Sequence, residues 1–158
     1  MMAKFRPDCM KSASSLIHIN TCMRYDPAMS DEAQTLYEVI GGEAKLREMV
    51  DRFYDLMELE PEFAGIRAMH PPTTQGSRDK LFWFLSGWMG GPDLFVERFG
   101  HPRLRARHLP FAVGTSERDQ WLRCMAWAMQ DVGIAEDLRL RLMQSFYDTA
   151  DWMRNKAD

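Results

Sequence analysis

The apolar positions of this chain recur three and four residues apart, which is the spacing of one face of a helix. Between Gly42 and Pro61 the recurring residues are Ala44, Leu46, Met49, Val50, Phe53, Tyr54 and Met57. The same spacing returns further along the chain at Leu81, Phe84, Leu85 and Trp88. Strict apolar and polar alternation, the mark of a half-buried strand, does not compete with it. The pattern therefore predicts an all-α chain.

Glycine and proline punctuate this pattern and divide it into elements. Breaks are expected at Gly41-Gly42, across the Pro71-Pro72 loop, and at Gly90-Gly91-Pro92. Acidic residues at 31 and 32 favour a helix start there, and Ser116 with Asp119 forms a capping pattern. The predicted helices span about 31–40, 43–60, 61–69, 77–89, 102–109, 116–132 and 136–154, with a short piece over 93–99 left without an assigned structure.

Residues 1–30 hold neither helical nor strand periodicity for long. We expect them to form a poorly ordered N-terminal extension, with residues 31–158 as the single domain. The internal Met29 precedes a sequence typical of a helix start and of a protein start. One hypothesis is therefore that the product begins at Met29, which the intact mass of the native protein would test.

Composition excludes several classes of protein. The chain has 20 basic and 23 acidic residues, a net charge of −3, which argues against a nucleic-acid binder. Every apolar run is too short to span a bilayer, and the basic N-terminus lacks the apolar core of a signal peptide. Three scattered cysteines, Cys9, Cys22 and Cys124, suit free thiols in a reducing compartment. A cytoplasmic protein is expected.

Four histidines are the candidate ligands. His18 lies in the extension, and His101 precedes Pro102, where a structural role such as capping is expected. His108 differs because Pro102 and Pro110 fix the backbone on both sides of its short helix. Taken alone, a single histidine is still more often structural. A zinc site would need three or four ligands at recognisable spacing, whereas heme needs one axial nitrogen, an apolar slot and a polar rim.

Other chemistry is weakly signalled. Gly90-Gly91 lacks the strand and lysine of a phosphate loop, and Glu58 and Glu60 are typical of a solvated surface. Three arginines alternate along the short helix, and in an acidic chain they suit the carboxylates of one small ligand better than nucleic acid. They are Arg103, Arg105 and Arg107.

Several long motifs, in order and at matching spacing, resemble the group II truncated hemoglobins of bacteria over about residues 35–155. They are Gly41-Gly42 before Arg52-Phe53-Tyr54, then Gly90-Gly91-Pro92, then Gly-His-Pro-Arg-Leu-Arg-Ala-Arg-His from Gly100 to His108 followed by Pro110-Phe111, and Glu117-Arg118-Asp119-Gln120-Trp121-Leu122. The resemblance implies a shortened globin fold, a two-over-two helical sandwich around heme b, with His108 as the proximal iron ligand.

The resemblance also implies the residues on the opposite, distal side of the heme. Tyr54 matches the tyrosine whose hydroxyl points toward the ligand, and Trp121 matches the tryptophan whose N–H does the same. Ser77 and Leu81, one turn apart, match the helix that faces this cavity. His70 matches a position that is Phe or Tyr in many globins. If His70 points inward it adds a polar group to the pocket, and the alternative is a side chain turned to solvent beside Pro71.

Further residues are expected around the heme edge. The candidate apolar contacts are Phe84, Trp88, Leu104, Phe111 and Met125. The candidates for the heme propionates are Lys80, Arg105 and Arg107.

Three functions follow as hypotheses. The first is reversible binding of oxygen, or of NO or CO, at a pentacoordinate ferrous iron, with slow oxygen release. The second is a heme redox enzyme, a nitric oxide dioxygenase or peroxidase-like protein, which needs a separate reductase because the chain has no flavin or nicotinamide motif. The third is a heme-free helical interaction module. We expect a monomer or homodimer.

Overall fold

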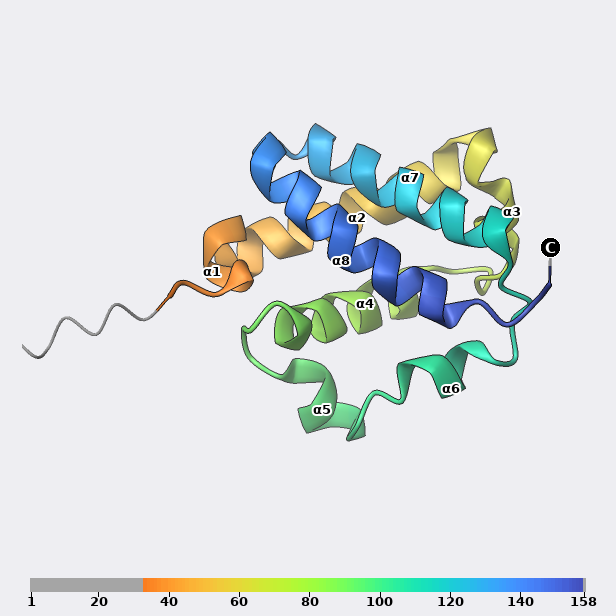
Figure 1. Ribbon diagram of the computed structural model, residues 1–158, viewed down its shortest axis with the longest axis horizontal. Helices are drawn as coiled ribbons and strands as arrows, with labels where there is room; N and C mark the ends of the chain where they lie inside the picture. Colours follow the sequence, from red (N-terminus) through yellow and green to blue (C-terminus); the bar gives the residue numbers. More distant parts are fainter. Residues whose placement is uncertain (1–32, 158) are drawn as a thin grey trace, which may run out of the picture. The chain divides into compact units, whose positions relative to one another are not determined.

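A computed structural model describes residues 33–157, and its regular elements within that range are all helical (Figure 1). They are α1 (Leu36–Ile40), α2 (Gly42–Leu59), the 3-10 turn η1 (Pro61–Phe63), α3 (Ala64–Ala68), α4 (Gln75–Trp88), α5 (Leu94–Phe99), α6 (Leu104–His108), α7 (Thr115–Asp131) and α8 (Glu136–Met153). The all-α prediction is confirmed. The expected extension over residues 1–30 and the proposed start at Met29 lie outside the described residues.

The four long helices form two pairs. α2 packs against α4, α7 packs against α8, and α2 also packs on α7 (Figure 1). A second link between the pairs is aromatic, because Trp88 at the end of α4 stacks on Phe146 of α8 with centroids 5.0 Å apart and planes at 11°. The short α5 contacts α4, and the short α6 contacts α8. The two-over-two arrangement that the resemblance implied is present.

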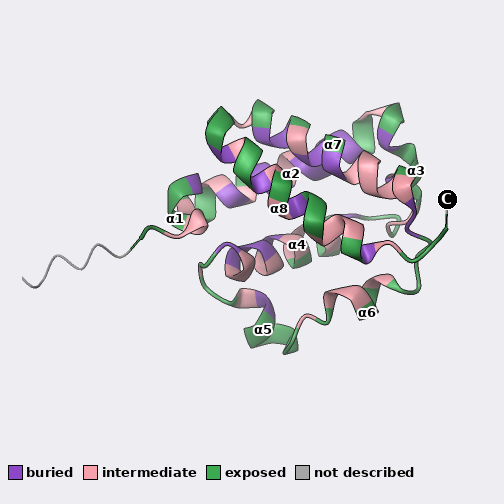
Figure 2. Ribbon diagram, in the orientation of Figure 1, coloured by how far each residue is buried: buried purple, intermediate pink, exposed green. Residues whose placement is uncertain are grey.

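The core lies between these pairs, where the inner faces of the long helices are buried (Figure 2). From α2 it takes most of the apolar face that the sequence predicted, namely Leu46, Met49, Val50, Phe53, Tyr54 and Met57, each at most 4% exposed. From α7 it takes Leu122, Cys124, Met125, Ala128 and Met129, and from α8 Leu138, Leu142 and Phe146. Among the described helices, none combines the length and hydropathy needed to cross a bilayer.

The predicted start of α1 and the predicted cap of α7 are wrong, and both errors concern capping residues. α1 begins at Leu36 rather than at 31, because the Thr35 hydroxyl accepts from the Glu38 N–H and the Glu38 carboxylate accepts from the Thr35 N–H. At α7 the cap is Gly114, whose N–H donates to the Glu117 carboxylate at 2.8 Å. Ser116 therefore lies inside the first turn of α7.

Candidate functional site

The short helix α6 carries His108 and is built by the residues around it. The chain enters through Arg103, whose φ of 44° is left-handed and whose N–H donates to Nδ1 of His101 at 3.1 Å. His101 thus has the structural role that the sequence suggested. At the other end, the half-buried His108 ring places Nδ1 2.8 Å from the Leu104 carbonyl oxygen. Since a carbonyl can only accept, Nδ1 carries the proton and Nε2 of the neutral ring keeps its lone pair.

A buried hydroxyl group is contributed by α2. Tyr54 is 4% exposed, and its ring meets Phe53 edge-on at 5.1 Å between centroids. Burial raises the pKa of Tyr54 well above its ordinary value, while the nearby Arg78 guanidinium and a hydrogen bond with the Ser77 side chain act in the opposite direction. The hydroxyl therefore remains protonated and able to donate at any physiological pH.

His70 turns inward rather than to solvent. Its ring is half-buried, stands edge-on to Tyr54 at 5.6 Å between centroids, and holds the Ile66 carbonyl oxygen 2.8 Å from Nδ1. Burial lowers the pKa of His70, and the charges of Arg67 and His108 lower it further, against the hydrogen bond to Ile66.

Trp121 of α7 joins these groups through ring contacts. Its indole lies 5.4 Å from Phe53 and 5.6 Å from Phe146, centroid to centroid, and is half-buried. A continuous aromatic series results, running His70, Tyr54, Phe53, Trp121, Phe146 and Trp88. The structure thus brings together four residues singled out from the sequence, namely His70, Tyr54, Trp121 and Trp88.

Two members of this series were not singled out as site residues. Phe53 belongs to the predicted apolar face of α2, and its role as the link between Tyr54 and Trp121 depends on where α7 lies. Phe146 follows Leu138 and Leu142 at intervals of four, which is a helical periodicity that could have placed it on the inner face of α8. Its contacts with Trp88 and Trp121 involve two other helices, so no pattern in the sequence around Phe146 predicts them.

An apolar face of α4 lies partly open beside these rings. Leu81, Phe84 and Trp88 pack against the core but are half-buried, whereas Leu85 on the same helix is 2% exposed. Met125, the other predicted apolar contact, is fully buried in α7. Half-buried apolar side chains on one helix face are what a bound apolar group would cover.

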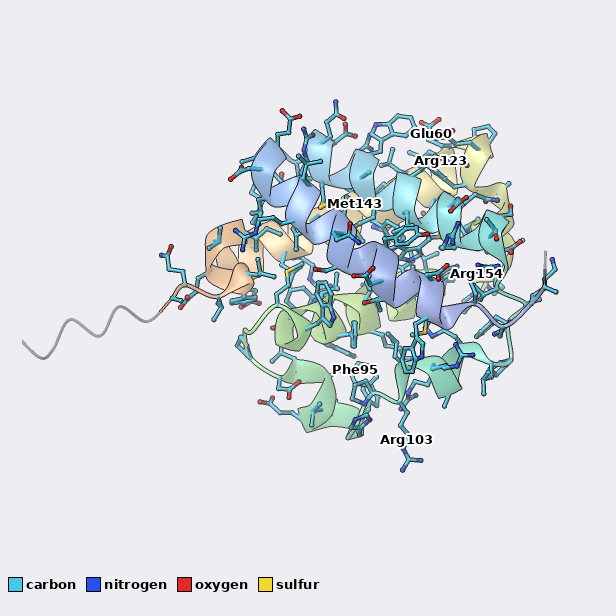
Figure 3. The ribbon with its side chains drawn as sticks, in the orientation of Figure 1. Glu60, Phe95, Arg103, Arg123, Met143 and Arg154 are labelled. Atoms are coloured by element: carbon cyan, nitrogen blue, oxygen red, sulfur yellow. The ribbon has the colours of Figure 1, made fainter. Side chains whose placement is uncertain are left out.

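The residues predicted for the heme rim are distributed over different elements. Lys80 of α4 and Phe111 after α6 are exposed, and Leu104 is half-buried. Arg105 donates to the main-chain carbonyls of Trp152 and Arg154. Arg107 donates to the Pro102 carbonyl at 2.8 Å and lies over the Phe95 ring. Figure 3 shows Arg103 pointing away from the helices.

The residues suited to a metal cluster are dispersed. Within the range 33–157, His, Cys, Asp and Glu side chains form no group of three or more that could hold a metal ion. Cys124 is fully buried, with Sγ 3.2 Å from the Phe53 carbonyl oxygen, and burial raises the pKa of its thiol to about 12. It is therefore a packed core residue.

Comparison with known proteins identifies this arrangement. Residues 35–155 match the family described as bacterial-like globin. The chain is 38% identical over 122 residues to group 2 truncated hemoglobin YjbI of Bacillus subtilis, which covers 77% of this chain and 89% of that protein. It is 43% identical to the solved group II 2-on-2 hemoglobin of Agrobacterium tumefaciens, with a TM-score of 0.77 over 82% of this chain and all of that one.

A further match among solved structures is the truncated oxygen-avid haemoglobin from Bacillus subtilis. Its structure superposes with a TM-score of 0.71 and is 38% identical, covering 77% of this chain and 100% of that chain. The family match, the identity and the fold agree with one another. The chain therefore belongs to the bacterial-like globin family, as a truncated hemoglobin of group II.

Proposed function

We propose that the chain binds heme b through Nε2 of His108 and that the heme-loaded protein reversibly binds oxygen, with slow release, and also NO and CO. Membership of a globin family implies a heme cofactor. The oxygen-avid description belongs to the Bacillus subtilis relative, and it supports the same ligand here.

The donor set fits heme. The observation that carries the proposal is the His108 imidazole, whose Nδ1–H is used by the Leu104 carbonyl so that Nε2 is left as a ligand nitrogen. The open apolar face of α4, with Leu81, Phe84 and Trp88, offers a surface for a flat apolar ring. We assign the heme propionates to basic residues at the rim. Lys80 is the best candidate, because it is exposed and forms no hydrogen bond or ion pair with the described residues. Arg105, by contrast, already donates to the Trp152 carbonyl of α8.

Bound heme would supply a ferrous iron with one coordination position open to a diatomic molecule. On the distal side, Tyr54 would donate from its hydroxyl, which stays protonated because burial raises its pKa. Trp121 would add an indole N–H. The side chains of Tyr54 and Trp121 are both held by ring contacts with Phe53, so that they would lose little conformational entropy on binding the ligand.

His70 has a different part in this proposal. Its Nδ1–H is used by the Ile66 carbonyl, so Nε2 of the neutral ring can accept but not donate. Because its pKa is lowered, the ring is neutral at neutral pH. His70 would therefore orient the Tyr54 side chain through the edge contact, and would donate to a ligand once it is protonated in acid.

Slow release follows from the number of donors. Each net hydrogen bond contributes about 1 kcal/mol, and about 1.4 kcal/mol corresponds to tenfold in binding. The two donors Tyr54 and Trp121 would therefore slow oxygen release by some tens fold, and His70, once protonated in acid, would extend this to about a hundredfold. Oxygen association and dissociation rates of the heme-loaded full chain test the proposal. Rapid release, unchanged when Tyr54 and Trp121 are both replaced by Phe, would refute it.

The redox enzyme remains the second candidate, and the same protein can be used to test it. Sustained consumption of nitric oxide in the presence of oxygen and a cellular reductase would favour the enzyme. A single stoichiometric reaction would favour the oxygen-binding protein.

A further inference from the structure

We propose that Asn155 is a positioning residue for His108, which it acts on by clamping the segment between α6 and α7 to the end of α8. This inference rests on the proposed function, because it treats His108 as the heme ligand.

The clamp consists of five hydrogen bonds. The Asn155 side-chain amide donates to the His108 carbonyl at 3.0 Å and to the Phe111 carbonyl at 2.9 Å, while its side-chain oxygen accepts from the Val113 N–H at 3.1 Å. The main-chain N–H groups of Asn155 and Lys156 both donate to the Val113 carbonyl, at 2.9 and 3.2 Å. One carboxamide therefore uses both of its donors and its acceptor on a single connection.

The connection depends on such a clamp because, apart from the buried Val113, apolar packing contributes little to its position. Every residue of α6 is half-buried or exposed, so apolar burial contributes weakly to its position. Leu109 and Phe111, just beyond it, are 59% and 44% exposed. α6 contacts α8, and the carbonyls at the end of α8 receive the Arg105 guanidinium. Arg105 and Asn155 thus tie α6 to α8 from two sides.

The geometry acts on His108 through its main chain. The bond from Nδ1 to the Leu104 carbonyl sets the rotation of the imidazole relative to α6. The bond from Asn155 to the His108 carbonyl sets where the end of α6 lies relative to α8. Together they fix the direction of the Nε2 lone pair. The chemistry also restricts the residue type, since Asp at 155 keeps the acceptor for Val113 and loses both donors.

The experiment compares Asn155→Ala and Asn155→Asp with the wild-type full chain. The matched control is Gln144→Ala, which removes an exposed amide that bonds within α8, to Asp148. Amide hydrogen exchange of the heme-free protein reads the clamp directly. We expect the Val113 amide to exchange about tenfold faster in Asn155→Ala, the equivalent of one lost hydrogen bond, and to change less in Asn155→Asp.

The heme-loaded proteins test the effect on His108. We expect heme loss to an acceptor globin to be about tenfold faster in both Asn155 variants, and within about twofold of wild type in the Gln144 control. The ferrous iron–histidine stretching band should shift or broaden in both variants, a signature that a loss of global stability alone would not produce. Unchanged heme loss and an unchanged band in both variants would overturn the proposal.

The failure of the proposed function is distinguishable. If His108→Ala keeps the iron–histidine band, His108 is not the ligand, and the positioning role falls with it. If His108→Ala loses the band while both Asn155 variants match wild type, the ligand assignment stands and the positioning role alone is refuted.

Discussion

Replacing Tyr54 by Phe removes one hydroxyl from a buried ring and leaves the rest of the site in place. The ring is 4% exposed and keeps its edge contacts with Phe53 and His70, so the packing should survive. The lost hydroxyl forms a hydrogen bond with Ser77, itself half-buried and able to recruit water, which limits the cost in folding stability to about 1 kcal/mol. That corresponds to a fall in Tm of about 4 °C.

The same hydroxyl is the proposed donor to the ligand. Losing a donor of about 1 to 1.4 kcal/mol should speed oxygen dissociation about five- to tenfold, measured by rapid mixing of the heme-loaded protein. The matched control is Tyr147→Phe, because Tyr147 is 44% exposed on α8, with the Arg118 guanidinium over its ring. An unchanged dissociation rate in Tyr54→Phe, or an equal change in Tyr147→Phe, would show that the Tyr54 hydroxyl is not a donor to the ligand.

Further predictions concern three other residues, His70, Cys124 and Gly91. Because the pKa of His70 is lowered, its ring should gain a donor proton as the pH falls below 6.5, so oxygen release should slow in acid and His70→Phe should abolish that slowing. The unfolded chain takes up this proton more readily than the folded protein does. As the pH falls below 6.5, the midpoint of urea-induced unfolding should therefore move to a lower urea concentration, and it should move less in His70→Phe. Burial raises the pKa of the Cys124 thiol to about 12, so Cys124 should resist a thiol reagent at pH 8 until the protein is unfolded. The labelling is measured in a chain whose other two cysteines are replaced by Ser. Rapid labelling of the native protein would contradict the burial of Cys124. Gly91→Ala should lower stability by about 1–3 kcal/mol in chemical denaturation, because its Cβ would lie 2.5 Å from Cγ of Tyr37, and an unchanged midpoint would show that the Tyr37 ring can move aside.

The helices and their order could be predicted because they depend on local spacing. The apolar face of α2 from Leu46 to Met57 is buried as its periodicity predicts, and the breaks at glycine and proline are in place. The start of α1 was wrong because acidic residues and a capping box are both start signals, and the Thr35 box with Glu38 is the stronger. Ser116 does not cap α7, because the capping interaction is the hydrogen bond from the Gly114 N–H to the Glu117 carboxylate.

The site could be predicted less completely, because its contacts cross between helices. The inward turn of His70 depends on the Ile66 carbonyl and the Tyr54 ring, and the sequence left both orientations open. Phe146 meets Trp88 and Trp121 through the packing of three helices. The clamp from Asn155 joins residues more than forty positions apart, and a lone asparagine after a helix gives no pattern to detect.

The assignment of His108 as the heme ligand is tested most directly by the absorption spectrum of the full chain with added heme. His101→Ala is the control, because His101 is exposed and its Nδ1 is used by Arg103. We expect one bound heme in wild type and in the control, and a lost or altered Soret band in His108→Ala that added imidazole restores. No heme band in wild type, or a band unchanged by His108→Ala, would contradict it.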